Sequence, residues 1–404
     1  MRKTTIDWAP IIPNSWETVR LKDIARLQSG NSITSDDIDD VGDYPVYGGN
    51  GLRGYTDTFT NDGEYVLIGR QGALCGNINY ARNKFFASEH AVVVYPFEKH
   101  ESIVWLGKTL EAANLNKLSA SAAQPGLAVS TLNFVKIPYP PKDERERIGR
   151  YLNAKTGEID ERIGLLEKKR ELQVRLKKAI INQTVTRGLD KNVKLKDSGV
   201  EWIGMIPEHW EVKRFKDVFR KYSTGFTPES KNIDNFSDNE EFTWVTIADM
   251  TTRVVGKSNL NLSQKAIEEN LPVLTLKGSL MFSFKLTIGK TAFAEKDLYT
   301  NEAIVSIPPH RNVDLNYFYY FIPMICMNNT TENIYGAKML NQRIIANMFF
   351  SLPPYEEQQA IAAYLDEKSA KIDTAIANID KQIDALKRLK RALINEVITG
   401  QRAI

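Results

Sequence analysis

The sequence predicts an α+β protein in which two globular domains of α/β type alternate with two long helices. Two internal repeats carry this prediction. The longer repeat begins at Pro140 and recurs at Pro353, so each residue of the first copy corresponds to the residue 213 positions later. The shorter repeat begins at Ile12 and recurs at Ile206, at the front of each half. Two repeated halves imply a pseudo-two-fold axis, and we therefore expect the helices to pair as an antiparallel coiled coil.

The longer repeat has the pattern of a helix that buries one face against another helix, because a mainly apolar series recurs in it every seven residues. Each copy follows a Pro-Pro pair and opens with acidic residues, which favour the positive end of a helix dipole. About 44 residues at ~1.5 Å each make a rod of roughly 65 Å, which suits a spacer. The two series are Leu152, Ile159, Leu166, Gln173 and Ile180, and Leu365, Ile372, Ile379, Leu386 and Leu393.

These anchors divide the chain into five segments. We expect a first globular domain at 1–139, a central helix at 140–186, a linker at 187–205, a second globular domain at 206–352 and a C-terminal helix at 353–404. Short apolar runs between Gly, Asn and Asp residues predict strands in both globular domains. The predicted strands are 65–68, 91–95, 242–245, 279–282 and 303–306, and the predicted helices are 102–118 and 315–326. The two domains share little sequence beyond their ends, which indicates two modules that have the same kind of function but act on different targets.

Composition excludes several classes of protein. With 404 residues, 42% hydrophobic and 25% charged, the chain has ordinary globular composition. Its net charge of +3 is close to balance, so binding to an anionic partner would depend on local basic patches. Two scattered cysteines and a start without an apolar signal core predict a reducing, cytoplasmic location. The longest uncharged stretch, 315–331, is shorter than the ~20 residues that a membrane span needs, so we expect no membrane association.

Motifs that resemble catalytic or cofactor sites fit structural roles better. Residues 49–54 match G-x-G-x-x-G, but no helical pattern follows to face a pyrophosphate, which favours a glycine-rich turn. Leu352 opens a Leu-Pro-Pro-Tyr run where amino-methyltransferases have Asn or Asp, so that run is interpreted as a helix start. Glu167 and Lys169 have nuclease-like spacing inside the heptad pattern, and the four histidines lack partners at metal-ligand spacing. We predict no catalytic residues, metal or cofactor.

Loop side chains that suit DNA remain as the candidate site. Arginine pairs bidentately with guanine, and glutamine or asparagine with adenine, while glycine lets the backbone approach a duplex closely. Each of these side chains taken alone is equally typical of a polar surface, but two sets in two modules favour DNA binding. The candidates are Arg53, Arg70, Gln71, Asn77 and Gln124 in the first domain and Lys285, Lys290, Lys338, Gln342 and Arg343 in the second.

Several segments together resemble the specificity subunit of a type I restriction–modification system. They are 44–51, 68–73, 199–204, 206–211 and 352–358. The resemblance implies two target-recognition domains that each read one half of a split double-stranded DNA site. It also implies that the helices dock two methyltransferase subunits, that restriction and translocase subunits join through the complex, and that this chain is not itself catalytic. One departure is Lys-Asp-Glu-Arg at 142–145, where the second helix opens with Tyr-Glu-Glu-Gln.

Two alternatives from other classes stay open at this point. The chain could be a DNA methyltransferase or nuclease whose active site has no recognisable motif, and incubation with labelled methyl donor and DNA would reveal it. It could also be a scaffold that bridges partners without touching DNA, which a salt-dependent gel shift with the assembled complex would distinguish.

Overall fold

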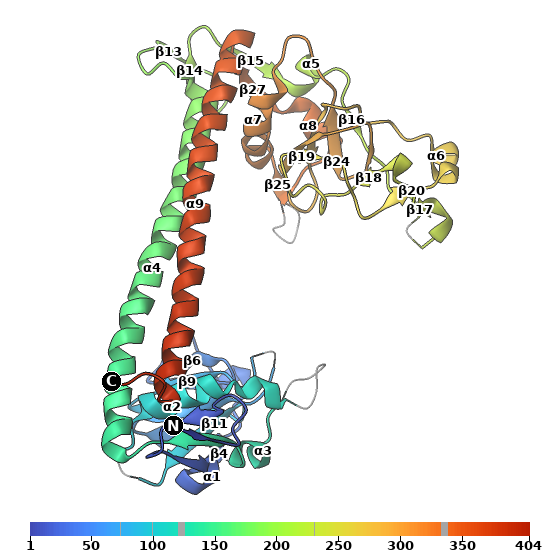
Figure 1. The fold of residues 1–404 in the computed structure, drawn as a ribbon. Coiled ribbons are helices and arrows are strands. Elements are labelled where there is room, and N and C mark those ends of the chain that lie inside the picture. The colour runs from blue at the N-terminus through green and yellow to red at the C-terminus, as the bar shows by residue number, and fades with distance from the viewer. Residues whose placement is uncertain (73, 99, 120–125, 230, 333–337) are drawn as a thin grey trace. The chain divides into compact units, whose positions relative to one another are not determined.

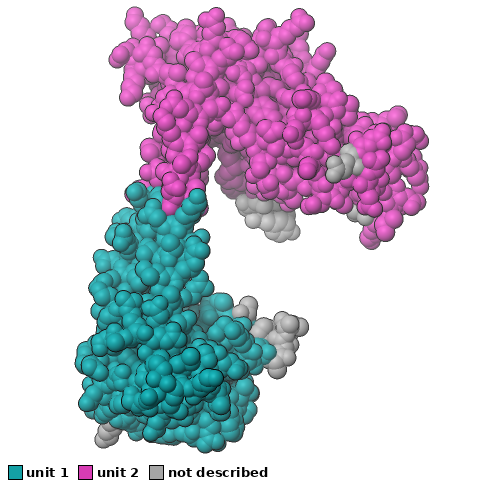
Figure 2. Space-filling model, viewed as in Figure 1, with its two compact units in different colours: residues 1–169, 379–404 teal, residues 170–378 magenta. Residues whose placement is uncertain are grey.

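A computed structural model describes residues 1–404 apart from 73, 99, 120–125, 230 and 333–337 (Figure 1). Contacts divide the chain into two compact units, which Figure 2 colours separately. Unit 1 comprises residues 1–169 and 379–404, and unit 2 comprises residues 170–378. Each unit therefore contains one globular domain and part of both long helices. Among the described residues, no helix is long and apolar enough to cross a membrane.

The globular domain of unit 1 contains two four-stranded sheets. The first is antiparallel with the order β4-β11-β8-β9, and the second has the order β6-β5-β10-β7 with β5 and β10 parallel. Strand β12 pairs with β3, and β1 pairs with β2. The strands are β1 Arg2–Lys3, β2 Ile11–Ile12, β3 Glu17–Arg20, β4 Ala25–Ser29, β5 Tyr44–Gly48, β6 Gly51–Thr56, β7 Asn61–Asp62, β8 Tyr65–Gly69, β9 Ile78–Ala81, β10 Lys84–Ala87, β11 Ala91–Pro96 and β12 Lys136–Tyr139. The helices are α1 Leu21–Ile24, α2 Ile103–Ala113 and α3 Val129–Asn133, with 3₁₀ turns at Ser35–Asp37 and Leu115–Leu118.

Strand β11 contributes to two cores, because successive side chains of a strand point to opposite faces of the sheet. Val92 and Val94 pack in one cluster with Trp105 of α2. Val93 packs on the other face with Phe85 of β10. Burial on both faces explains why this segment is an almost continuous apolar run.

Unit 2 contains a larger sheet with the order β16-β24-β21-β22-β19, and a parallel pair formed by β18 and β23. Strand β27 pairs with β15, β20 with β17, β26 with β25 and β14 with β13. The strands are β13 Leu195–Asp197, β14 Met205–Pro207, β15 Glu211–Arg214, β16 Ser223–Thr224, β17 Phe236–Ser237, β18 Trp244–Val245, β19 Val254–Val255, β20 Asn261–Leu262, β21 Leu280–Ser283, β22 Thr291–Ala294, β23 Tyr299–Thr300, β24 Ile304–Ile307, β25 Thr331–Glu332, β26 Lys338–Met339 and β27 Phe349–Leu352. The helices are α5 Phe215–Val218, α6 Gln264–Asn270, α7 Leu315–Asn328 and α8 Gln342–Asn347, with 3₁₀ turns at Ile233–Asn235 and Glu240–Phe242.

The two globular domains share one fold despite their different sequences. Strand pairing matches β4, β8, β9 and β11 of unit 1 with β16, β21, β22 and β24 of unit 2. A glycine follows the edge strand in both, because the backbone of the neighbouring strand leaves no room for a side chain. A Cβ atom would lie 2.1 Å from the Ala87 carbonyl oxygen at Gly30, and 1.9 Å from the Thr300 oxygen at Gly225. The predicted α+β class with an internal repeat is thus confirmed.

Most predicted elements of the globular domains are present. The helix predicted at 102–118 is shorter, because α2 ends at Ala113, where Asn114 adopts a left-handed conformation with a φ of 51°, and a separate 3₁₀ turn follows. Two further segments differ. The strand predicted at 242–245 is limited to β18, because a 3₁₀ turn occupies 240–242. The predicted linker 187–205 contains β13, which pairs with β14 in an antiparallel ribbon. Gly199 and Gly204 have positive φ angles of 71° and 66°, which turn the chain between these two strands. The polar composition of β13 reflects its full exposure rather than a lack of structure.

The long helices are α4 Lys142–Arg187 and α9 Tyr355–Ile398, and they begin in equivalent ways. The Arg145 guanidinium donates a hydrogen bond to the Pro140 carbonyl oxygen at 2.8 Å, and the Gln358 amide donates to the Pro353 oxygen at 2.9 Å. Arg145 therefore replaces Gln358 in holding the Pro-Pro segment, which accounts for the different opening of the first copy.

Within each unit, segments of α4 and α9 pack against each other in antiparallel fashion. In unit 1, Lys390 pairs with Asp160 at 2.6 Å and Lys387 with Glu167 at 3.9 Å. One residue number falls as the other rises, as antiparallel helices require. Every member of both predicted heptad series is buried or half-buried, and the members Ile159, Leu166, Ile379 and Leu386 form a cluster with Ile163 and Ile383. The predicted antiparallel helix pairing is confirmed.

Candidate nucleic-acid interface

A cleft of about 540 Å³ in unit 1 brings together two of the glycine-rich loops that the sequence singles out. One wall is the turn between β5 and β6, and the other is the loop that follows β8. Arg53 and Gln71, both predicted site residues, line the cleft together with His90. The remaining lining residues are Gly49, Asn50, Gly51, Leu52 and Gly72.

The G-x-G-x-x-G segment forms the β5–β6 hairpin, so the predicted glycine-rich turn is confirmed. Gly51 has a φ of +95°, which favours glycine, and a Cβ atom there would lie 2.9 Å from Asn79 Oδ1. Gly69 is equally constrained, because its Cβ atom would lie 2.0 Å from the Gly49 carbonyl oxygen. The two loops can approach this closely only because both positions lack side chains.

Backbone hydrogen bonds fix the loop that follows β8. The Arg70 amide donates to the His90 carbonyl oxygen at 2.8 Å, and the Arg70 oxygen accepts from the Leu127 amide at 2.9 Å. The Arg70 side chain donates to Ser29 Oγ at 3.0 Å, and Asn77 Nδ2 donates to Asn50 Oδ1 at 3.3 Å. Of the predicted residues, Arg53 thus lies near the start of β6, and Arg70, Gln71 and Asn77 lie in the adjoining loop between β8 and β9, while Gln124 lies outside the described residues.

Three polar residues of this region, Asn79, Glu89 and His90, were not predicted. His90 Nε2 lies 3.1 Å from Glu89 Oε1, and its Nδ1 atom is buried without a hydrogen-bond partner among the described residues. The Asn79 side-chain amide nitrogen is also buried without a partner in that part of the chain. Both side chains carry unused hydrogen-bonding capacity at the cleft. Their position depends on tertiary contacts, and the only sequence signal is that His90 directly precedes a buried strand.

Unit 2 has the equivalent loop at 284–290, between β21 and β22. The Phe284 amide donates to the Ala303 oxygen at 3.0 Å, as Arg70 does to His90, and Lys290 occupies the position of Asn77. The Lys290 ammonium donates to the Ile247 carbonyl oxygen at 2.9 Å, so this cation also stabilises its own domain. Lys285 is half-exposed, with its Nζ atom 3.8 Å from Glu302.

The remaining predicted residues of unit 2 lie on β26 and α8. Lys338 is exposed in β26, and Arg343 is exposed in α8, the helix capped by the Asn341 side chain. Gln342 Nε2 donates to Thr224 Oγ1 at 2.9 Å. Thr224 is the equivalent of Ser29, which accepts from Arg70 in unit 1. Gln342 therefore reaches the same edge of the sheet from another element.

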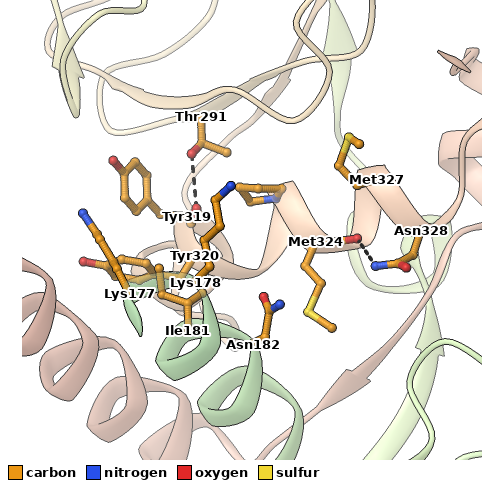
Figure 3. A pocket seen from close by; sticks show the side chains of 11 residues that line it. Lys177, Lys178, Ile181, Asn182, Thr291, Tyr319, Tyr320, Met324, Met327 and Asn328 are labelled. Carbon is orange, nitrogen blue, oxygen red and sulfur yellow. Dashed lines mark hydrogen bonds between the residues drawn. The ribbon is translucent and has the colours of Figure 1, made fainter. Parts of the chain in front are cut away.

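A second cavity, of about 420 Å³, lies in unit 2 between α4 and α7 (Figure 3). Tyr319, Met324 and Ile181 give it an apolar lining, and the Lys178 side chain also lines it. In unit 1 the equivalent part of α2 is covered by Tyr80, whose hydroxyl lies 3.1 Å from Glu111. Among the described residues, no group of three His, Cys, Asp or Glu side chains is arranged to hold a metal ion.

A family model described as the type I restriction modification DNA specificity domain matches residues 13–169 and 207–387. The EcoprrI type I specificity subunit of Escherichia coli is 42% identical over 31% of this chain and 32% of its own length. The MjaIX specificity subunit of Methanocaldococcus jannaschii matches over 43% of its length, so the chain spans less than half of these two relatives. The MjaVIII specificity subunit of the same organism is 22% identical over 96% of this chain and 93% of its own length.

Two solved structures have a similar fold. A chain from a study of the assembly and conformational transition of the type I R-M system has a TM-score of 0.72 at 16% identity, over 97% of this chain and 99% of that chain. The HsdS subunit of Thermoanaerobacter tengcongensis has a TM-score of 0.51 at 16% identity, over 97% and 98% of the two chains.

Proposed function

This chain belongs to the type I restriction–modification DNA specificity family, and from that premise we propose that it selects the DNA on which its complex acts. Each globular domain reads one half of a bipartite double-stranded site. The observation that carries the proposal is the duplicated domain, because equivalent loops extend from the same edge of equivalent sheets with different side chains. Arg70 and Gln71 follow β8, whereas Phe284 and Lys285 follow β21. The two half-sites should therefore differ in sequence.

The first domain has the chemistry of direct base reading. Arg53 and Gln71 line a cleft between glycine-rich loops, and these side chains suit guanine and adenine edges in the major groove. Lys285 of the second domain has one distant ion pair and suits a phosphate or a guanine. Catalysis is supplied by partner subunits, in agreement with the family, and a labelled methyl donor incubated with this chain and DNA should transfer nothing.

Methylated-site sequencing of cells that carry the complete system tests the proposal. The expected result is one bipartite motif with two different half-sites and a fixed unread gap. A salt-dependent gel shift with the assembled complex supplies the independent measurement, since phosphate contacts make affinity fall as salt rises. A complex that binds DNA equally well at every sequence would contradict the proposal, and a complex that does not bind DNA would favour the scaffold.

Exposed apolar residues on the long helices support the docking of two methyltransferase subunits. Leu172 and Leu176 of α4 are 55% and 47% exposed. They come just before Lys177 in the sequence, and Lys177 lines the cavity shown in Figure 3. Exposed apolar surface that partners normally cover makes an isolated chain prone to aggregate. We expect this chain to need co-expressed methyltransferase subunits for solubility and for selective DNA binding.

Replacement of Leu172 and Leu176 by Asp should reduce co-purification of a methyltransferase subunit, because a charge in an apolar contact loses its hydration. The matched control is Leu271→Asp, at an exposed leucine outside the long helices. Unchanged co-purification of both subunits, or nanomolar selective binding by a monodisperse isolated chain, would count against this docking surface.

The helices should also set the length of the unread gap. Insertion of one heptad after Gln173 and another after Leu386 keeps the apolar series in register. Each insertion adds about 10 Å of helix, which equals roughly three base pairs at ~3.4 Å per base pair. Methylated-site sequencing should then find the same half-sites with a longer gap, whereas an active variant with an unchanged gap would show that the helices do not set it.

A further inference from the structure

One turn of the duplicated domain keeps the same charged residue in both units. In unit 1 the turn between β10 and β11 comprises residues 88–90, and in unit 2 the turn between β23 and β24 comprises residues 301–303. The two turns are equivalent because each accepts a hydrogen bond from the residue that follows the neighbouring strand, Arg70 or Phe284. The central residue is Glu89 in unit 1 and Glu302 in unit 2.

The surroundings of these two glutamates are not shared. Glu89 Oε2 accepts from the Ile33 amide at 3.3 Å, and its Oε1 atom lies 3.1 Å from His90. Glu302 is 48% exposed, with its Oε1 atom 3.8 Å from Lys285 Nζ. At the next position His90 corresponds to Ala303, so the turns have diverged around the glutamate. The Glu89 side chain is 34% exposed, so core packing does not explain why both copies retain a carboxylate at this partly exposed position.

A carboxylate next to this interface has a specific chemical consequence. DNA phosphates repel it, so it weakens binding unless a hydrogen-bond donor of the DNA meets it. The donors in the major groove are exocyclic amino groups, N4 of cytosine and N6 of adenine, and a carboxylate accepts well from them. Arg53, Arg70 and Lys285 are donors, which suit guanine or phosphate. The glutamates supply the opposite hydrogen-bonding character.

We propose that Glu89 and Glu302 are specificity-determining residues, each of which accepts a hydrogen bond from the exocyclic amino group of one base in its half-site. This inference rests on the proposed function. It implies that both half-sites contain an amino-bearing base, cytosine or adenine, at the position that its own domain reads through this turn. His90 and Lys285 then hold their neighbouring carboxylates in place.

The test uses the complex assembled with its methyltransferase subunits and a duplex library randomised across both half-sites. Glu302→Ala should reduce discrimination at one position of one half-site by about five- to a hundredfold and leave the other half-site unchanged, because alanine has no acceptor for the amino group. Glu89→Ala should do the same in the other half-site. Because each change removes a negative charge, affinity for random DNA should be equal to or higher than that of the wild type. If Glu89→Ala lowers stability, Glu302→Ala still tests the inference, since no backbone amide donates to Glu302 in the described structure.

Base analogues then identify the amino group. At the position where preference changes, 2-pyrimidinone replaces cytosine, or purine replaces adenine, so that only the amino group is removed. The wild type should bind the analogue more weakly, and the Ala variant should be affected less. The matched controls are Glu64→Ala and Glu295→Ala, whose exposed carboxylates lie at the opposite ends of β8 and β22 from the loops.

Three outcomes separate the inference from the proposed function. A changed preference at one position, with a weaker response to the analogue, supports the inference. Unchanged preference at every position in both Glu89→Ala and Glu302→Ala, with a selective wild type, overturns the inference alone. A wild-type complex without any sequence preference overturns the proposed function as well.

Discussion

The long helices and the globular domains have diverged to very different degrees. In the helices the same ion pair occurs twice, because Lys177–Asp373 in unit 2 is the repeat equivalent of Lys390–Asp160 in unit 1, and both measure 2.6 Å. The contacts that hold each globular domain against its helix differ in residue type and in direction. The helix pairing therefore has the same ion pair in both units, whereas each globular domain contacts its helix through different residues.

In unit 1 the arginine that holds the globular domain against the long helix belongs to the helix. Arg145 of α4 is almost fully buried, pairs with Glu98 and with Glu101 at 2.9 Å, and lies 4.1 Å from the centre of the Tyr139 ring. The side chains of Arg145 and Glu101 are only 3% and 4% exposed, so this ion pair lies almost out of contact with water. The equivalent residue in α9 is the neutral Gln358, which accepts from the Asp314 backbone amide and donates to the Pro353 carbonyl oxygen.

In unit 2 the arginine that holds the globular domain against the long helix belongs to the globular domain. Arg253 reaches Asp366 of α9 at 2.5 Å and lies 4.7 Å from the centre of the Tyr319 ring. Its side chain is 34% exposed, and the Tyr320 hydroxyl also bonds Asp366, at 2.6 Å. This contact is more exposed to solvent than the Arg145 contact of unit 1, and Asp366 has a second partner in Tyr320. The comparison shows that the two domains contact their helices through different residues.

The largest predicted effect is the removal of the buried arginine. Arg145→Met should lower the free energy of unfolding of unit 1 by about 3–5 kcal/mol, because the Glu101 carboxylate remains buried and unpaired. Arg253→Met in unit 2 should cost only about 1–2 kcal/mol, because solvent screens the remaining Asp366. Hydrogen exchange of β11 and β24 peptides reports the two units separately. The double change Arg145→Met with Glu101→Gln should restore part of that stability, and equal costs at the two arginines would contradict the comparison.

The second prediction concerns independent reading by the two domains. Replacement of Arg70 and Gln71 by Ala should weaken recognition of one half-site only, by about 1–3 kcal/mol for each bidentate pairing with a base that the change removes. Lys285→Ala, in the equivalent loop, should leave that half-site unchanged. Competition binding with single-base variants of both half-sites measures the difference. Equally weakened recognition of both half-sites would show that the modules do not read independently.

The smallest predicted effect tests the ion pair that both units share. Asp160→Asn and Asp373→Asn should each destabilise the helix pair by about 0.2–1 kcal/mol, which is typical of exposed ion pairs. The two costs should be equal, since both carboxylates are more than half exposed and both meet a less exposed lysine. Urea unfolding in low and high salt checks this, because salt screens such pairs. Unequal costs, or costs that persist in ~1 M salt, would mean that the pairs have separate roles.

The long helices could be predicted because their pattern is local. Heptad spacing and a Pro-Pro start identify α4 and α9 without knowledge of distant residues. The bounds of α4 lie within two residues of the predicted 140–186, whereas α9 ends at Ile398, six residues before the predicted end at 404. The common fold of the globular domains could not be predicted in the same way. It depends on pairings such as β5 with β10 and β18 with β23, which join residues far apart in sequence. Different sequences satisfy those pairings.

The candidate site was predictable where glycine and a reading side chain are neighbours in sequence. Arg53 and Gln71 belong to such loops, and the structure brings them to one cleft. His90 and Asn79 reach that region only through strand order, so no local signal identifies them. Lys290 illustrates the opposite case, since nothing in the sequence indicates that its ammonium donates to the Ile247 oxygen.

The end of α9 completes the core of unit 1, and this affects the order in which the chain matures on the ribosome. Leu393, Val397 and Ile398 pack with Trp16 in one cluster, and a Cβ atom at Gly400 would lie 2.3 Å from Pro13. These residues are synthesised more than 200 positions after residue 169. At about 5–20 residues per second, the first domain waits roughly ten to forty seconds for its missing apolar segment. A nascent chain that terminates early keeps that face uncovered, which marks it for chaperones and proteases before it can compete for partners.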